Sequence, residues 1–353
     1  MSEGLTVAVT GPTGDIGRAF LRALDKHPAV DRILGMARRP FDPAAEGYKK
    51  AEYRQGDILD ITSCDELVAE ADVVAHLAFV IVGSDKQETR RINLEGSRNV
   101  FTSAFNKGVR RLVYTSSVAA YGFHDDHPEL IAEDVEPRGS DAHYYSAQKA
   151  SVEELLANLG TALGRETDVY IFRPCIVAGP TALSLIENIP YVRIGQRLPG
   201  AAKKLLGALP LLRPVIPDPG TPVQIVHEDD VAAALVAGVL GRGEPGPYNL
   251  AAFGEITLTD IAHALGWYAL PVADIVIEAT TRVVSKLPYL PAEAAWVNAI
   301  KSPVLVDTTR ARTKLDWKPT HDALETLSEL VAAARARGLL TLKEREFAAS
   351  GAE

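Results

Sequence analysis

Tyr145 and Lys149 have a spacing that suits proton transfer. They stand at i and i+4 in the sequence, so a helix would place the phenol and the ammonium on one face. A free phenol has a pKa of about 10, and bringing it to neutrality takes about 4 kcal/mol of extra stabilisation of the phenolate. A neighbouring ammonium and the positive ring of an oxidised nicotinamide both act in that direction. The pair predicts a tyrosine acid–base supported by Lys149, whereas Tyr144 has the wrong offset from the lysine.

Hydroxyl groups end an apolar run that precedes this pair. Residues 112–115 are expected to form a strand, and Ser116 and Ser117 follow it directly. A serine hydroxyl in this place can hold a substrate oxygen while a tyrosine exchanges its proton. We therefore expect Ser117 to act together with Tyr145.

A glycine-rich motif follows the first apolar run of the chain and precedes a predicted helix. Its glycines have the spacing GxxGxxG, rather than the GxGxxG of the older dinucleotide-binding fingerprint. Residues without a Cβ let the backbone approach a pyrophosphate, whose charge then lies at the helix N-terminus. The motif predicts a dinucleotide site with contacts from Gly11, Thr13, Gly14, Asp15, Ile16 and Gly17.

Other residues that suit a cofactor follow the predicted strands. Asp57, followed by Ile58, can accept a hydrogen bond from an adenine amino group. Leu77 and Ala78 end the fourth predicted strand, and Asn93 puts an amide where a helix core position is expected. We assign all five to the cofactor site.

The end of the second predicted strand bears on the choice of cofactor. An acidic residue there would bind the ribose hydroxyls of the adenosine and repel a 2′-phosphate. Ala37 stands in that place, and Arg38 and Arg39 follow it. Arg38 can stack on the adenine and, with Arg39, bind a phosphate through paired hydrogen bonds. NADP(H) is therefore expected in preference to NAD(H), and NAD(H) is the alternative if the arginines remain in solvent.

These motifs need a parallel sheet that brings several strand ends to one edge. Short apolar runs alternate with helix-length segments in the first half of the chain, which is typical of a doubly wound α/β fold. The expected strands are 5–10, 33–37, 52–54, 73–77, 112–115, 169–172 and 223–226, with weaker candidates at 272–278 and 304–306. The expected helices are 16–24, 65–70, 91–107, 142–160, 229–240, 309–315, 323–337 and a short one near 343–347.

The chain length and the sequence pattern indicate two parts. A chain of 353 residues exceeds the usual size of one domain, and the alternation of apolar runs and helix-length segments becomes irregular after Pro180. We expect a Rossmann-type NAD(P)-binding domain in residues 1–180, with returning segments around 223–250. A smaller α/β substrate-binding part would comprise 181–222, with loops and short helices, and 251–340, followed by a tail at 341–353.

Charge and cysteine content limit the function classes. The net charge is −9, with acids and bases interspersed, so no nucleic-acid partner is expected. Cys64 and Cys175 form no metal-ligand set, and His76 is expected to be packed and hydrogen-bonded, so we expect no metal site. No apolar stretch has the length of a membrane span, and the first apolar run lacks the basic start of a signal peptide. The sequence predicts a cytoplasmic protein with a small-molecule substrate; a homodimer is compatible with it.

Together these motifs resemble the extended branch of the short-chain dehydrogenase/reductase superfamily, the NAD-dependent epimerase/dehydratase group. The similarity extends over residues 11–17, 56–58, 93–100, 117–122, 145–149, 173–174, 226–231 and 315–319. It implies a Rossmann sheet of about seven parallel strands with a small C-terminal substrate domain. It also implies that the catalytic triad is Ser117, Tyr145 and Lys149, that Asn93 supports it, and that the residues from Pro174 to Val177 line the nicotinamide.

The substrate half of the chain favours an apolar substrate. Members of this group that act on nucleotide sugars commonly carry an arginine four residues before the histidine of the Val-His motif. Val223 stands there, before His227. Without a guanidinium at this position, a site would bind a diphosphate weakly. Arg213 is near in sequence but lies in an apolar context. Residues 205–216 suit a cover over a nonpolar substrate, and simple packing on the sheet is the alternative.

Three functions follow from these observations. The first is an NAD(P)-dependent oxidoreductase acting on a secondary alcohol or carbonyl of a small, rather apolar substrate, similar to dihydroflavonol reductases and 3β-hydroxysteroid dehydrogenases. The second is a nucleotide-sugar epimerase or dehydratase in which a tightly bound NAD oxidises the substrate transiently. The third is a non-enzymatic, cofactor-sensing regulator, whose expected mark is loss of the Tyr/Lys pair that this chain retains.

Overall fold

The chain folds into two compact units. The computed structural model describes residues 4–81, 85–141, 143–163, 166–196, 213–272 and 303–340. The first unit comprises Met1–Cys175, Glu228–Ala251 and Val304–Thr320, and the second comprises Ile176–His227, Ala252–Pro303 and His321–Glu353. Each unit has its own secondary structure and its own core.

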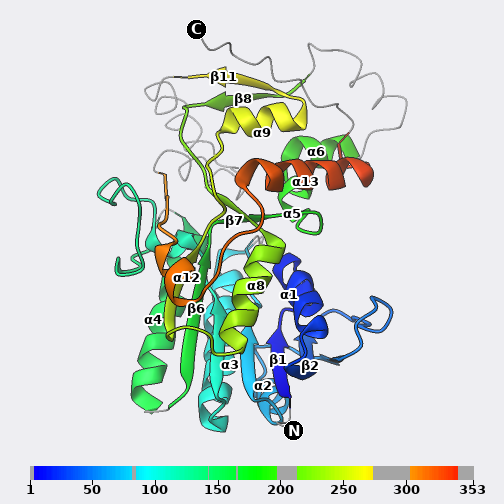
Figure 1. The fold of residues 1–353 in the computed structure, drawn as a ribbon, viewed down its shortest axis with the longest axis vertical. Helices are drawn as coiled ribbons and strands as arrows, with labels where there is room; N and C mark the ends of the chain where they lie inside the picture. Colours follow the sequence, from blue (N-terminus) through cyan, green and yellow to red (C-terminus); the bar gives the residue numbers. More distant parts are fainter. Residues whose placement is uncertain are drawn as a thin grey trace. The chain divides into compact units, whose positions relative to one another are not determined.

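A seven-stranded sheet forms the centre of the first unit (Figure 1), with the strand order β10-β6-β5-β4-β1-β2-β3 and parallel pairing throughout. The last four residues of β1 and all of β4 are buried, as expected for parallel strands that are covered on both faces. The Rossmann-type parallel sheet predicted from the sequence is thereby confirmed. Its strands are β1 (Leu5–Thr10), β2 (Val30–Ala37), β3 (Ala51–Gln55), β4 (Val73–His76), β5 (Arg111–Thr115), β6 (Asp168–Pro174) and β10 (Gly246–Leu250).

Helices cover both faces of this sheet. On one face α1 (Asp15–Lys26) packs against α8 (Glu228–Val239), and on the other α3 (Lys86–Lys107) packs between α2 (Ile61–Val68) and α4 (Tyr144–Leu163). Asp85 caps the start of α3 by accepting hydrogen bonds from two backbone N–H groups, and Gly108 ends the helix in the left-handed conformation with φ 70°. The short helix η1 (Val118–Tyr121) follows β5, and α12 (Thr309–Lys314) completes the unit.

The second unit is built from two small parallel sheets and four helices among its described residues. β7 (Ile176–Ala178) pairs with β9 (Ile225–His227), and β8 (Val215–Asp218) pairs with β11 (Tyr268–Pro271). The helices are α5 (Ser184–Glu187), α6 (Pro190–Gln196), α9 (Leu258–Leu265) and α13 (Ala323–Ala336). Its core includes Ile225, Leu265, Trp267 and Leu330, so apolar burial holds β9, α9 and α13 together.

Some elements differ from the expectation. β10 was not predicted, because its glycine, proline and asparagine oppose strand formation, but it is an edge strand, where proline is tolerated. Residues 304–306 form only an isolated bridge between Val306 and Ile131, so the strand predicted there is wrong. Helix α9 was missed although Thr257 and Asp260 form its capping box. The predicted strand 272–278 beyond Val272 and the predicted helix near 343–347 lie outside the described residues.

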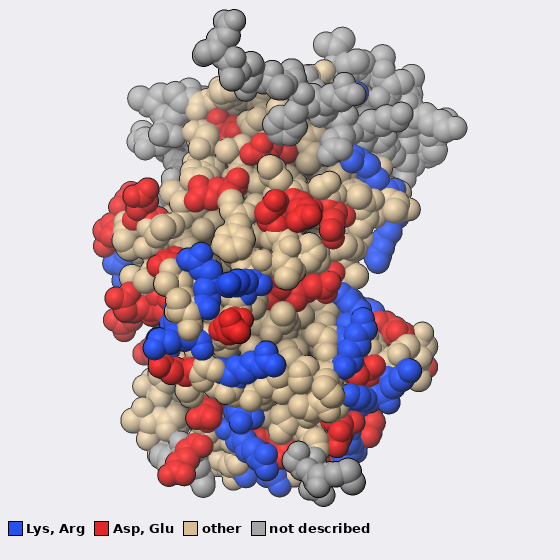
Figure 2. Space-filling view, viewed as in Figure 1, with Lys and Arg blue, Asp and Glu red and all other residues tan. Residues whose placement is uncertain are grey.

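Within the described ranges, no helix is both long and apolar enough to cross a membrane. Acidic and basic side chains are intermingled on the face drawn in Figure 2. Their fields therefore partly cancel on this face.

Candidate active site

The glycine-rich turn joins β1 to α1 at the carboxyl edge of the sheet. Gly11 has φ 73°, and a Cβ on it would lie 2.8 Å from the Cα of Ala78, so both the backbone conformation and the close approach of the chain after β4 require glycine. The predicted cofactor residues of the turn and those after β4, Leu77 and Ala78, are thus brought together. Since β1 lies between β4 and β2, this is the point where the strand order reverses, and dinucleotides bind there in doubly wound sheets.

The other two glycines of the turn have different surroundings. A Cβ on Gly17 would lie 2.3 Å from the carbonyl oxygen of Gly11, so the fold itself excludes a side chain. Gly14 is the exposed N-cap of α1, and a Cβ on it would meet only that same oxygen, at 3.7 Å. Internal packing therefore does not explain Gly14, whereas a phosphate approaching the N-terminus of α1 would. The turn fits a dinucleotide, with Thr13 before this N-terminus and Asp15 and Ile16 as the first helical residues.

Arg38 and Arg39 follow β2 at the same edge of the sheet and are exposed. Within the described part of the chain, neither guanidinium has a hydrogen bond or an ion pair. The N–H of Gly56 donates to the carbonyl oxygen of Ala37 at 3.1 Å, which places Asp57 beside the end of β2. This arrangement leaves two free cations next to the predicted adenosine side of the turn.

Asp57 and Ile58 form the loop after β3. One carboxylate oxygen of Asp57 accepts a hydrogen bond from the N–H of Leu59 at 3.0 Å, which fixes the side chain. Ile58 is buried, and its side chain fills the space where a Cβ on Gly96 of α3 would lie. Asp57 is therefore available to a ligand through its second oxygen, while Ile58 anchors the loop to α3.

His76 and Asn93 are fully buried polar groups near the end of β4. The imidazole is bonded to Thr10 Oγ1 at 2.7 Å and Ser97 Oγ at 2.9 Å, and burial, followed by the charge of Lys149, lowers its pKa to about 3. The prediction that His76 is packed and hydrogen-bonded is confirmed.

Asn93 connects three segments of the first unit. Its Oδ1 accepts from the N–H of Val80 at 2.8 Å, and its Nδ2 donates to the Oε1 of Gln148 at 2.7 Å. It thereby ties α3 to α4 and to the chain after β4. Fully buried and fully bonded, Asn93 positions the site rather than presenting a free amide to it.

Ser117, Tyr145 and Lys149 are brought together by η1 and the first turns of α4. Ser117 Oγ accepts from the N–H of Ala119 at 3.2 Å and lies 3.5 Å from the carbonyl oxygen of Pro174, at the end of β6. The phenol of Tyr145 is hydrogen-bonded to Ser117. Tyr145 is 9% exposed and Lys149 3%, so all three groups act in a largely dry environment.

Burial dominates the electrostatics of the pair. Lys149 Nζ donates to the carbonyl oxygen of Thr115 at 2.8 Å and lies 3.7 Å from the ring centroid of Phe79. Burial lowers the pKa of Lys149 to about 7, and Glu153 acts in the opposite direction. Burial raises the pKa of Tyr145 to about 12, and the hydrogen bond with Ser117 acts in the opposite direction. The phenol therefore keeps its proton until a further positive charge approaches it.

Sequence reading missed Glu153, which belongs to a buried network beside the pair. Glu153 is ion-paired with Arg173 at 2.6 Å and accepts a hydrogen bond from Ser116 at 2.5 Å. Arg173 also donates to the phenol of Tyr121 at 2.8 Å. Glu153 stands four residues after Lys149, so the same helix-face argument applied once more would have found it.

The remaining predicted residues are placed as follows. Tyr144 donates a hydrogen bond from its phenol to the carbonyl oxygen of Ile81. Pro174 ends β6, whereas Val177 lies on β7 in the second unit. A role for Val177 at the nicotinamide stays a prediction.

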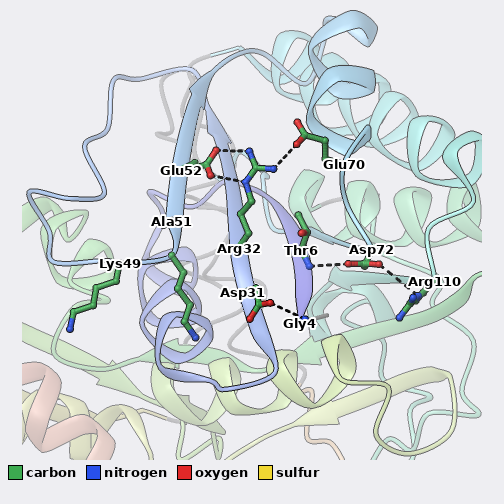
Figure 3. A pocket seen from close by; sticks show the side chains of 11 residues that line it. Gly4, Thr6, Asp31, Arg32, Lys49, Ala51, Glu52, Glu70, Asp72 and Arg110 are labelled. Atoms are coloured by element: carbon green, nitrogen blue, oxygen red, sulfur yellow. Dashed lines mark hydrogen bonds and ion pairs between the residues drawn. The ribbon is translucent and has the colours of Figure 1, made fainter. Parts of the chain in front are cut away.

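An open pocket of about 680 Å³ lies at the opposite, amino edge of the sheet (Figure 3). Arg32 is paired with Glu52 at 2.6 Å and with Glu70 at 2.5 Å, and Asp72 lies 3.7 Å from Arg110. The charged side chains drawn there mostly point toward one another. Because these charges neutralise each other in solvent, the pocket offers a ligand little, and the carboxyl edge is the stronger candidate.

The chain is similar to known proteins in sequence and in structure. A family model described as "NAD dependent epimerase/dehydratase family" matches residues 7–251. An uncharacterized protein of Mycobacterium tuberculosis is 28% identical over 344 residues, which are 97% of this chain and 31% of that protein. The chain thus spans about a third of the length of this relative and of two others with the same coverage.

Two further relatives match about half of the chain. Sterol demethylase protein B of Methylococcus capsulatus is 29% identical over 178 residues, or 50% of this chain and 52% of that protein. Cinnamoyl-CoA reductase 1 of Petunia hybrida is 28% identical over 214 residues, or 57% of this chain and 62% of that protein.

Solved structures share the fold. The crystal structure of gox2253 has a TM-score of 0.73 at 23% identity, covering 96% of this chain and 99% of that one. MoeE5 in complex with UDP-glucuronic acid and NAD has a TM-score of 0.69 at 18% identity, covering 95% of this chain and 100% of that one.

Proposed function

Because the chain belongs to the NAD-dependent epimerase/dehydratase family, we propose that it is an NAD(P)-dependent oxidoreductase that interconverts a secondary alcohol and a carbonyl. The observation that carries the proposal is the buried group of Ser117, Tyr145 and Lys149. A phenol bonded to a serine, with an ammonium on the same helix face, is an arrangement suited to moving one proton at a substrate oxygen.

A nicotinamide held at the carboxyl edge of the sheet would supply or accept the hydride at the substrate carbon. Ser117 Oγ holds the substrate oxygen, and Tyr145 Oη gives that oxygen its proton during reduction or removes it during oxidation. The ammonium of Lys149 stabilises the resulting phenolate, and it acts strongly because water is largely excluded around it. Asn93 keeps α4 in place through Gln148.

For the cofactor we propose a preference for NADP(H). Ala37 cannot accept the ribose hydroxyls or repel a 2′-phosphate, and the exposed guanidinium groups of Arg38 and Arg39 are free of partners among the described residues. A charge-assisted contact to the phosphate contributes about 1.5–3 kcal/mol, or about 10- to 100-fold in affinity.

Titration of NADPH and NADH into the wild type and into Ala37→Asp tests this preference. The wild type should bind NADPH more tightly, and the aspartate should reverse the order by accepting the ribose hydroxyls and repelling the phosphate. Equal affinities in the wild type, or tighter binding of NADH, would contradict the role of the arginines. The proton-transfer proposal would survive that result, because it concerns the nicotinamide end.

For the substrate we propose a small, rather apolar alcohol or ketone. Val223 stands where a diphosphate-binding arginine would, and its backbone is bonded to Ile256 in both directions while its side chain packs on the core of the second unit. Arg213 donates to the carbonyl oxygen of Gly266 at 3.4 Å. The names of two relatives, a sterol demethylase protein and a cinnamoyl-CoA reductase, also support a reaction outside sugar chemistry.

A nucleotide-sugar epimerase or dehydratase is the second candidate, favoured by the fold shared with MoeE5, which binds UDP-glucuronic acid and NAD. Thermal shifts with apolar ketones and with UDP-sugars, followed by assays of nicotinamide oxidation, separate the two. Net oxidation of NADPH by an apolar ketone supports the reductase. Co-purified NAD together with UDP-sugar conversion and no net redox change would overturn it in favour of the second candidate.

A further inference from the structure

Three side chains with metal-binding atoms meet within the second unit. They are His227 at the end of β9, His321 just before α13, and Glu329 in the second turn of α13. One ligand atom from each lies within 4.8 Å of the others, and Nε2 of His227 is 3.3 Å from Oε2 of Glu329. The two imidazole rings are stacked, with centroids 3.8 Å apart and planes at 19°. No metal site was predicted from the sequence, in which His227 is far from His321 and Glu329.

The fold holds the backbone of this cluster in place. His227 is 1% exposed and ends a strand whose neighbour Ile225 packs in the same core as Leu330 of α13. The start of α13 is fixed by the reciprocal capping box of Asp322 and Glu325, directly after His321. Both anchors lie in the second unit, so the cluster needs no residue from the first.

From this arrangement we propose that His227, His321 and Glu329 bind a divalent transition metal ion, with Zn²⁺ as the ion of best fit. Two imidazole nitrogens and one carboxylate oxygen are the ligand set of His₂Glu zinc sites, in which water takes the fourth position. Magnesium and calcium prefer sites made entirely of oxygen, so two nitrogen ligands discriminate against them.

Metal binding requires a small rearrangement that the partial exposure of His321 and Glu329 permits. A bound metal lies near the plane of each imidazole, and two almost parallel rings have no common point close to both planes. One ring must therefore turn, and the partly exposed His321 can do so while the buried His227 stays. The side chain of Glu329 is 42% exposed, so it can follow, and the fourth position opens to water.

Such a site would connect the end of β9 to the start of α13. A ligand that binds only the folded state stabilises it in proportion to the logarithm of its concentration over its Kd. The proposed metal site is therefore a clamp within the second unit, separate from the residues that we assign to proton transfer.

The test is a zinc titration of the tag-free, full-length wild type by calorimetry and thermal denaturation. We expect one zinc ion per chain and a rise in the unfolding temperature, and no effect of magnesium at the same concentration. Removing a residue that only supports a metal ligand typically costs about 10- to 100-fold in metal affinity. His321→Asn and Glu329→Gln remove a ligand itself, so each should cost at least about 100-fold. Cobalt(II) should give a visible absorption spectrum that both variants lose.

His263→Asn is the matched control, because His263 lies on α9 in the same unit but outside the cluster. This variant should bind zinc as the wild type does. Glu329→Gln keeps the shape of a partly exposed side chain and so tests the site even if changes at the histidines disturb folding. Absence of stoichiometric zinc binding, or affinity that neither variant lowers, would overturn the proposal.

Discussion

The charged residues at the two edges of the seven-stranded sheet differ in their exposure to solvent. At the amino edge, Arg32 is bonded to Glu52 and Glu70 in an exposed pocket, and the charges neutralise one another. At the carboxyl edge, Lys149 is 3% exposed and rests on an aromatic ring and one carbonyl oxygen. The charges of the amino edge are exposed to water. At the carboxyl edge, by contrast, the burial of Lys149 lowers the stability of the folded state.

That cost in stability supports the proposal that proton transfer takes place at the carboxyl edge. Burial lowers the pKa of Lys149 from 10.5 to about 7 and raises the pKa of Tyr145 from 10.0 to about 12, because a dry environment disfavours the charged form of each group. A cationic ring entering this region would favour the phenolate. The exposed ion pairs of the amino edge lack this sensitivity, because water already screens them.

Among the changes proposed here, Tyr145→Phe at the carboxyl edge should have the largest effect on turnover. Removing the phenolic proton should reduce turnover about 10²- to 10⁴-fold while leaving cofactor affinity nearly unchanged. Steady-state rates and cofactor titrations measure both quantities. Tyr144→Phe is the matched control, since its hydroxyl is bonded to the carbonyl oxygen of Ile81. Retention of more than about a tenth of the rate by Tyr145→Phe would contradict the acid–base role.

Gly14→Ala and Gly17→Ala should separate binding from folding within one turn. The alanine at position 14 finds space in the protein and should fold normally, but it should weaken cofactor binding about 10-fold or more, which is about 1.4 kcal/mol. The alanine at position 17 meets backbone at 2.3 Å, and overpacking of this kind costs about 1–3 kcal/mol of stability. Urea unfolding and cofactor titration of both variants test the contrast, which fails if Gly14→Ala binds cofactor as well as the wild type.

Lys149→Met should remove a pH dependence of stability. The pKa of Lys149 is lowered by burial from 10.5 to about 7, so between these values the unfolded chain binds more protons than the folded one and stability rises with pH. From pH 7 to pH 9 the wild type should gain about 2–3 kcal/mol relative to Lys149→Met. The free energy of unfolding in urea, measured without cofactor at both pH values, gives the difference. Parallel pH profiles for the two proteins would show that the lysine is not desolvated as described.

Arg32→Ala at the amino edge should have the smallest effect on turnover and on cofactor affinity. It removes the central cation of the amino-edge pocket, whose partners are half exposed. Because such pairs contribute little in water, turnover and cofactor affinity should change by less than about twofold. A large loss of activity in this variant would mean that the amino edge takes part in function.

The parallel sheet and the candidate residues at its carboxyl edge could be predicted from the sequence alone, because both depend on local patterns. Apolar runs ending in Gly11, in Ala78 and in Ser117 predicted strand ends at one edge, and the spacing of Tyr145 and Lys149 needed only a helix to share a face. Buried parallel strands and helix periodicity are read from neighbours in the chain. These predictions did not depend on which segments meet across long distances.

The tertiary structure decided what depends on distant neighbours. It showed that Gly17 is required by the Gly11 carbonyl oxygen whereas Gly14 is not, and that Gly246–Leu250 forms an edge strand despite its strand-opposing residues. It brought Arg173 from β6 onto Glu153, and His321 and Glu329 onto His227. The spacing of these residues in the chain carries no such information, since burial and pairing arise only when separate segments pack, and the same packing sets the pKa of Lys149.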